Sequence, residues 1–200
     1  MTIAANKMQR CFQCLLIFST LAFSWLAMQV VHELGHVMHA WASGGAVVRV
    51  YLHPLNISRT DVAMNSHPLF VAWGGVIWGC ALPLVLFGLV RWLRPAEAYL
   101  PAFFAGFCLI SNGAYLAAGS WAEVGDAGDL IRHGSPQWLL VAFGLPACGL
   151  GFRLWHRLGP NFGLGLARGQ VDRRAAYGVT FALIVLVLVE LLAGGLAVKG

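Results

Sequence analysis

Charged residues are scarce in this chain. Only 10% of its 200 residues are Asp, Glu, Lys or Arg, and only 8 are acidic. Hydrophobic residues make up 59% of the chain, and the mean hydropathy is +0.73. A soluble domain of this size would leave much of its apolar surface in water. The shortage of charge therefore excludes a soluble globular protein and indicates an integral membrane protein.

The sequence also lacks two other features: a cysteine pattern typical of disulfide-bonded domains and a cluster of positive charge. Three of the five cysteines, at positions 80, 108 and 148, fall within apolar stretches, where cysteine behaves as a small apolar residue. This argues against a disulfide framework. The formal net charge is +5, but the basic residues are dispersed and lack the continuous basic face that nucleic acid requires. We therefore expect the lipid bilayer, and no nucleic acid, as a partner.

Long apolar stretches recur along the chain. Most reach the roughly 20 residues that cross the hydrocarbon core of a bilayer. The fourth is the shortest, and Trp138 and Trp155 mark its two interfaces. The expected fold is an all-α membrane protein, a single polytopic domain over residues 1–200, with about five transmembrane helices at 15–42, 68–90, 99–121, 138–156 and 175–198.

The segment between the first two spans has a different character. Gly44 and Gly45 stop the first helix, and the residues from Val47 to Leu52 are β-branched or aromatic, as is typical of a strand. Pro54 and Asn56 favour a turn, after which Ile57 to Met64 can return beside the first arm. A short strand or hairpin is expected here.

Basic residues are distributed unevenly between alternate loops. Of the 13 Lys and Arg residues, those at 7, 10, 91, 94, 153, 157, 168, 173 and 174 fall on one side, and those at 49, 59, 132 and 199 fall on the other. By the positive-inside rule the N-terminus is cytoplasmic. The expected location is the bacterial inner (plasma) membrane.

The pentapeptide His32-Glu33-Leu34-Gly35-His36 lies within the first span. Residues four apart project from one helical face, so His32 and His36 can hold one Zn²⁺ while Glu33 is placed to activate water. Such groups are costly to bury in hydrocarbon and usually serve a function. The alternative is that this end of the helix reaches the interface and its polar side chains meet water.

A catalytic zinc takes a third protein ligand. The first and third spans run in the same direction, so the segment after Trp121 lies on the side where the first span ends. Three carboxylates spaced by three residues occur there. We favour Asp126 as the third ligand, with Asp129 as the alternative and then Glu123; a solvated loop is the other interpretation of these residues. His39 shares the arc of the two histidines, but three ligands from one short stretch would strain tetrahedral geometry.

Asn112 is an amide within an otherwise apolar span and needs a hydrogen-bond partner. It is a candidate for binding an extended substrate backbone or for orienting the site. The equal alternative is a bond to a neighbouring helix only.

These motifs resemble the site-2 protease family of intramembrane zinc metalloproteases. The family places H-E-x-x-H on its first core helix and an aspartate ligand on or near the third. His32 to His36 match the first motif completely. The family commonly shows Asn-x-x-Pro followed by Leu-Asp-Gly, whereas here Asn112 lacks the proline and Asp126 lies in Val124-Gly125-Asp126-Ala127. The chain is thus similar to a divergent, compact member.

The resemblance implies a reaction and a role for each polar residue of the pentapeptide. His32 and His36 are expected as ligands and Glu33 as general base. The expected activity is that of a zinc-dependent endopeptidase, which hydrolyses a peptide bond in or next to a transmembrane segment of a membrane-protein substrate. The family generally cleaves near the cytoplasm, whereas the loop charges put this site near the outer face, so orientation stays open. The alternative is a non-catalytic polytopic protein, either a degenerate protease relative or a metal-binding scaffold.

Overall fold

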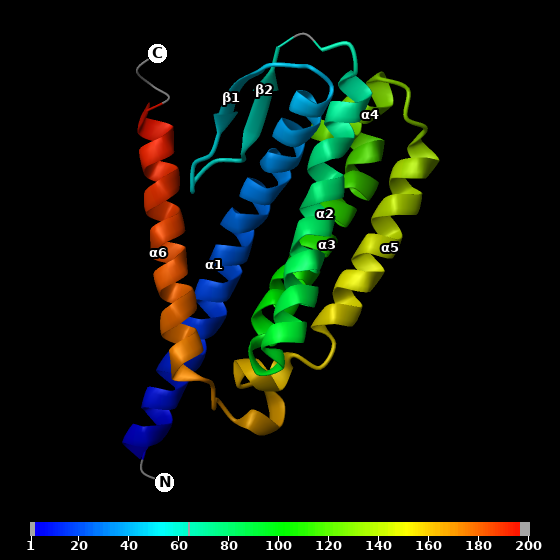
Figure 1. Cartoon of the computed structure of the whole chain (residues 1–200). Helices are drawn as coiled ribbons and strands as arrows, with labels where there is room; N and C mark the ends of the chain where they lie inside the picture. The colour runs from blue at the N-terminus through cyan, green and yellow to red at the C-terminus, as the bar shows by residue number, and fades with distance from the viewer. Residues whose placement is uncertain (1–2, 64, 197–200) are drawn as a thin grey trace.

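Five long helices carry most of the chain in the computed structural model, which describes residues 3–63 and 65–196 (Figure 1). Within these ranges all five are long and apolar enough to cross a membrane. This confirms the expected all-α membrane fold. The five helices are α1 (Ile3–Ala42), α2 (Pro68–Leu93), α3 (Tyr99–Ala122), α5 (Gln137–Trp155) and α6 (Arg173–Leu196).

Apart from the start of α1, the helix bounds agree with the expected spans to within three residues. The apolar run begins at Leu15, yet the helix begins at Ile3. Lys7 and Arg10 are good helix formers, so they extend the helix beyond its apolar part. Met64 and the last residues of the fifth expected span, 197–198, lie outside the described residues.

A two-stranded antiparallel hairpin follows α1, as expected. Strand β1 (Val47–Tyr51) pairs with β2 (Arg59–Val62), and Val50 is opposite Thr60. Gly44 ends the helix with a φ of +74°, a left-handed conformation that glycine adopts without strain. Figure 1 shows the hairpin lying along the C-terminal half of α1, on the side of α6.

Glycines allow the helices to approach each other closely. Gly35 of α1 faces Gly74 of α2, and a methyl group on either residue would overlap the backbone oxygen of the other. Gly113 of α3 and Gly144 of α5 meet in the same way. Small residues at such crossings are typical of membrane helices, where close backbone packing stabilises association. The α1 helix is therefore held directly against α2 at the level of the pentapeptide.

The chain reverses sharply after α3. Glu123 and Gly125 both have left-handed backbone conformations, with φ of 52° and 54°. The short helix α4 (Gly125–Arg132) then packs Ala127 and Leu130 against α2 and α3. In Figure 1, α4 lies at the same end of the bundle as the hairpin and the C-terminal end of α1. The remaining connections contain the 3₁₀ turns η1 (Pro95–Glu97), η2 (Gly159–Phe162) and η3 (Gly165–Ala167).

Candidate metal centre

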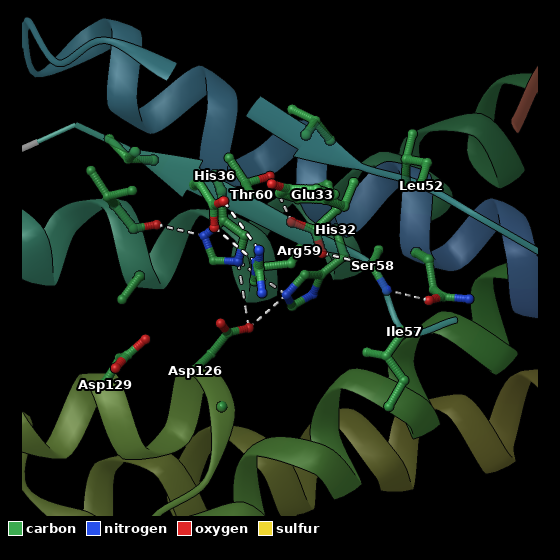
Figure 2. A pocket seen from close by; sticks show the side chains of 18 of the residues that line it. His32, Glu33, His36, Leu52, Ile57, Ser58, Arg59, Thr60, Asp126 and Asp129 are labelled. Atoms are coloured by element: carbon green, nitrogen blue, oxygen red, sulfur yellow. Dashed lines mark hydrogen bonds and ion pairs between the residues drawn. The ribbon is translucent and has the colours of Figure 1, made fainter. Parts of the chain in front are cut away.

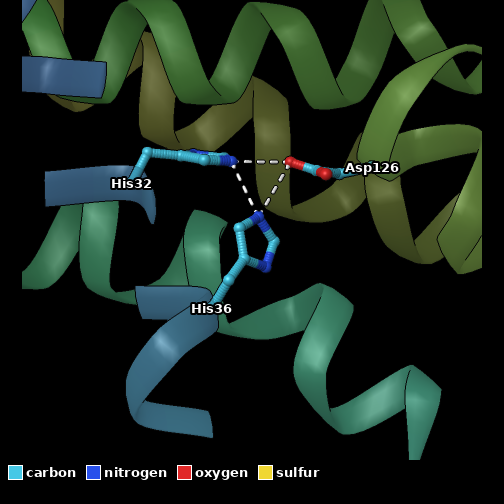
Figure 3. Close-up of side chains that lie close together, drawn as sticks. All are labelled: His32, His36 and Asp126. Carbon is cyan, nitrogen blue, oxygen red and sulfur yellow. Dashed lines mark hydrogen bonds and ion pairs between the residues drawn. The ribbon is translucent and has the colours of Figure 1, made fainter. Parts of the chain in front are cut away.

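Two imidazoles and one carboxylate converge where α1 meets α4 (Figure 3). Nε2 of His32 lies 2.6 Å from Oδ2 of Asp126 and 3.1 Å from Nε2 of His36. Nε2 of His36 lies 3.4 Å from the same Asp126 oxygen. Both histidines are buried. Three ligand atoms, from residues as far as 94 positions apart in the chain, thus point at one small volume.

The other ring nitrogen of each histidine is held by a separate hydrogen bond. Nδ1 of His36 is 2.9 Å from the carbonyl oxygen of Val71, which can only accept, so Nδ1 carries the proton. Nδ1 of His32 is 2.7 Å from Oδ1 of Asn112, whose amide nitrogen donates to the carbonyl of Cys108. In the neutral ring each Nε2 is then unprotonated, which is the form that binds a metal.

Gly75 of α2 keeps the space beside the two imidazoles open. A methyl group on Gly75 would overlap Nε2 of both His32 and His36. Gly79, one turn later, lies against the Asn112 side chain, and a methyl group there would come within 2.9 Å of its polar atoms. The glycine pair Gly75 and Gly79 therefore brings α2 against the cluster, as small residues four apart commonly do between membrane helices.

Asp126 lies in the first turn of α4, and its backbone N–H donates to the Tyr115 hydroxyl at 3.2 Å. Burial by itself raises the pKa of the Asp126 carboxyl. The hydrogen bonds and charges that His32 and His36 supply when their Nε2 atoms carry protons outweigh that effect and hold its pKa well below the usual range. Asp126 is therefore a carboxylate at neutral pH, which is the form that acts as a ligand.

The arrangement fits a zinc ion. Zinc is bound by imidazole nitrogen and carboxylate oxygen at about 2.0 Å, and tetrahedral ligands then lie about 3.3 Å apart. The three donor atoms are 2.6 to 3.4 Å apart, so small shifts would meet this geometry. His32, His36 and Asp126 can hold the metal and leave a fourth position for water or substrate.

Other candidate residues from the sequence lie outside this group. Asp129 forms an ion pair with Arg132 on the same helix and is half-exposed. Glu123 is exposed at the left-handed turn that ends α3. His39 stacks on the ring of Phe70, with centroids 4.1 Å apart, and its Nδ1 lies 2.6 Å from the Phe70 carbonyl oxygen.

Glu33 is only 5% exposed, and its carboxylate is directed at the hairpin (Figure 2). The Ser58 hydroxyl donates to Oε1 at 2.7 Å, and the Thr60 hydroxyl donates to Oε2 at 2.6 Å. These two residues had no sequence signal of their own, because only the folded hairpin brings them to α1. Glu33 thus lies beside the three-residue group without joining it.

A cavity of about 1340 Å³ opens beside the cluster. Its walls include His32, Glu33 and Asp126, together with residues from both hairpin strands and from α2 and α3. The volume exceeds the 300–1,000 Å³ that is usual for small-molecule pockets. The cavity is therefore large enough for an extended segment of polypeptide.

Comparisons with family models, with curated proteins and with solved structures gave no match to this chain. Any functional assignment depends on the residues and geometry described above.

Proposed function

We propose that this protein is a zinc-dependent intramembrane endopeptidase of the site-2 protease type. It hydrolyses a peptide bond in or next to a transmembrane segment of another membrane protein. The observation that carries the proposal is the convergence of His32, His36 and Asp126 within a bundle of membrane-spanning helices. Buried ionisable groups such as the two histidines are costly in a membrane and mark functional sites.

The donor set supports a catalytic role for the metal over a purely structural one. Structural zinc sites are usually closed by four Cys or His ligands, whereas catalytic sites have three protein ligands and an open position. Here the described residues group two histidines with one aspartate, and the cavity adjoins them. A substrate can therefore reach the open position.

Each residue has a distinct task in the proposed reaction. Zinc, when bound, supplies Lewis acidity at the scissile carbonyl. Glu33 takes a proton from the attacking water and returns it to the leaving amine. Asn112 and the Val71 carbonyl hold the two imidazoles in the tautomer that binds metal.

The substrate must expose its backbone before it can react, because a helix engages its carbonyls in its own hydrogen bonds. A two-stranded sheet leaves a free edge on each strand, and such an edge can pair with an extended peptide. The strand from Val47 to Tyr51 is the proposed edge, and its residues 49–51 line the same cavity as Glu33.

We also propose the bacterial inner membrane as the location of the protein.

Substitution of Glu33 by Gln tests the proposal. The amide keeps the size of the side chain but cannot act as a base, so Glu33→Gln should retain zinc and lose cleavage of model single-span proteins in proteoliposomes. The rival hypothesis, a metal-binding scaffold without activity, predicts that neither protein cleaves any of them. Cleavage that survives Glu33→Gln would refute the role of Glu33.

A further inference from the structure

The carboxylate of Glu33 has a defined set of partners in the part of the chain that the structure describes. Each of its oxygens accepts a hydrogen bond from a different hydroxyl group, one from Ser58 and one from Thr60. Both donors belong to the returning arm of the hairpin, 25 and 27 residues from Glu33 in the chain. Figure 2 shows the Glu33 side chain beside β2.

A third bond ties the same arm of the hairpin to α1. The backbone N–H of Ser58 donates to Oε1 of Gln29 at 2.8 Å. Gln29 is buried and lies one helical turn before Glu33. Ser58 therefore bridges two successive turns of α1, through its backbone to Gln29 and through its side chain to Glu33.

The hairpin does not need these hydroxyls for its own pairing. Thr60 is paired with Val50 in the β-ladder, in which the strands are joined through their backbones. Ser58 lies just before β2. A buried carboxylate, by contrast, is costly unless hydrogen-bond donors compensate it. The side chains of Ser58 and Thr60 thus serve Glu33.

We propose that Ser58 and Thr60 are positioning residues that fix the Glu33 carboxylate relative to the hairpin, an inference that rests on the proposed function. A carboxylate offers about four acceptor sites, so two hydroxyl bonds leave sites free to take a proton. A substrate strand that pairs with the hairpin is then placed in register with the base, because the base is attached to the same hairpin. The hydroxyl groups of Ser58 and Thr60 therefore affect the rate of the reaction but not the affinity for the metal.

Kinetics with matched variants test this proposal. Thr60→Val removes the hydroxyl at nearly constant shape, and Thr60→Ser keeps it. A misplacement of about 1 Å can cost roughly 100-fold in rate, so kcat should fall at least about tenfold in Thr60→Val and in Ser58→Ala. KM should stay within about twofold, Thr60→Ser should recover most of the lost kcat, and zinc content should not change. The exposed Ser66, in the connector to α2, provides the control substitution Ser66→Ala.

A double-mutant cycle measures the hydrogen bond without any activity assay. The shifts in Tm of metal-free Glu33→Gln and Thr60→Val should not add in the double variant, because the two residues are in contact. Additive shifts would overturn the proposal even if the wild-type protein cleaves its substrate. Unchanged or increased kcat in Thr60→Val and Ser58→Ala would also overturn it. A zinc-loaded wild type that cleaves no substrate would refute the proposed function, and with it the positioning role of Ser58 and Thr60. The double-mutant cycle would still measure the hydrogen bond between Glu33 and Thr60.

Discussion

The substitution Gly75→Ala tests the geometry of the metal centre with a single methyl group. The new Cβ would be fixed to the backbone of α2, where it overlaps Nε2 of both His32 and His36. A helix backbone held against α1 at Gly35 and Gly74 has little room to withdraw. The two imidazoles must therefore rotate away from their present positions.

The size of the effect follows from the bonds that such rotation breaks. Nδ1 of His32 would lose Asn112, and Nδ1 of His36 would lose the carbonyl of Val71. Each hydrogen bond contributes about 1 kcal/mol net. The loss of both would weaken zinc binding by about 2 kcal/mol, which corresponds to about 30-fold in Kd.

Competition with a chromogenic zinc chelator in detergent measures this change. The matched control is Gly88→Ala on the same helix, where an added methyl group meets nothing within 4 Å. Gly88→Ala should bind zinc like the wild type. If Gly75→Ala bound zinc within about threefold of this control, the described arrangement of the imidazoles would be wrong.

Three further predictions concern the same centre. Asp126→Ala should lose zinc, whereas Asp129→Ala should keep it, because Asp129 is paired with an arginine of its own helix; zinc content by mass spectrometry compares the two. Asn112→Leu should weaken zinc binding about 10- to 100-fold, the usual cost of removing a partner that orients a histidine ligand, and the chelator competition would contradict this if affinity were unchanged. Zinc affinity should fall as pH falls from 8 to 5, because protons compete with zinc for neutral imidazole ligands. The Asp126 carboxylate should not contribute to this loss of affinity, because its lowered pKa keeps it ionised between pH 8 and 5. Protonation of Asp126 within this pH range would contradict the prediction.

The fold could be predicted from the sequence because its determinants are local. Apolar length identifies each span, and β-branched residues after Gly44 identify the hairpin. The first residue of α1 could not be predicted from apolar length. Lys7 and Arg10 end the apolar run, but they do not end the helix.

The choice among the three carboxylates required the fold. Glu123, Asp126 and Asp129 follow one another at intervals of three residues, so they lie at similar distances in sequence from the two histidines. The sequence alone therefore does not distinguish them as ligands. The left-handed turn at Glu123 and Gly125 directs the first turn of α4, and hence Asp126, toward α1. The bonds from Ser58 and Thr60 to Glu33 depend on how the hairpin packs on α1, which no local pattern encodes.

X-ray absorption at the zinc edge of the purified, zinc-loaded protein reports the ligands of the metal centre itself. We expect about one zinc per chain, with nitrogen and oxygen ligands at about 2.0 Å and no sulfur ligand at about 2.3 Å. His32→Ala should abolish this signal, and His39→Ala should leave it unchanged. A sulfur ligand, or equal zinc in wild type and His32→Ala, would show that His32, His36 and Asp126 do not hold the metal.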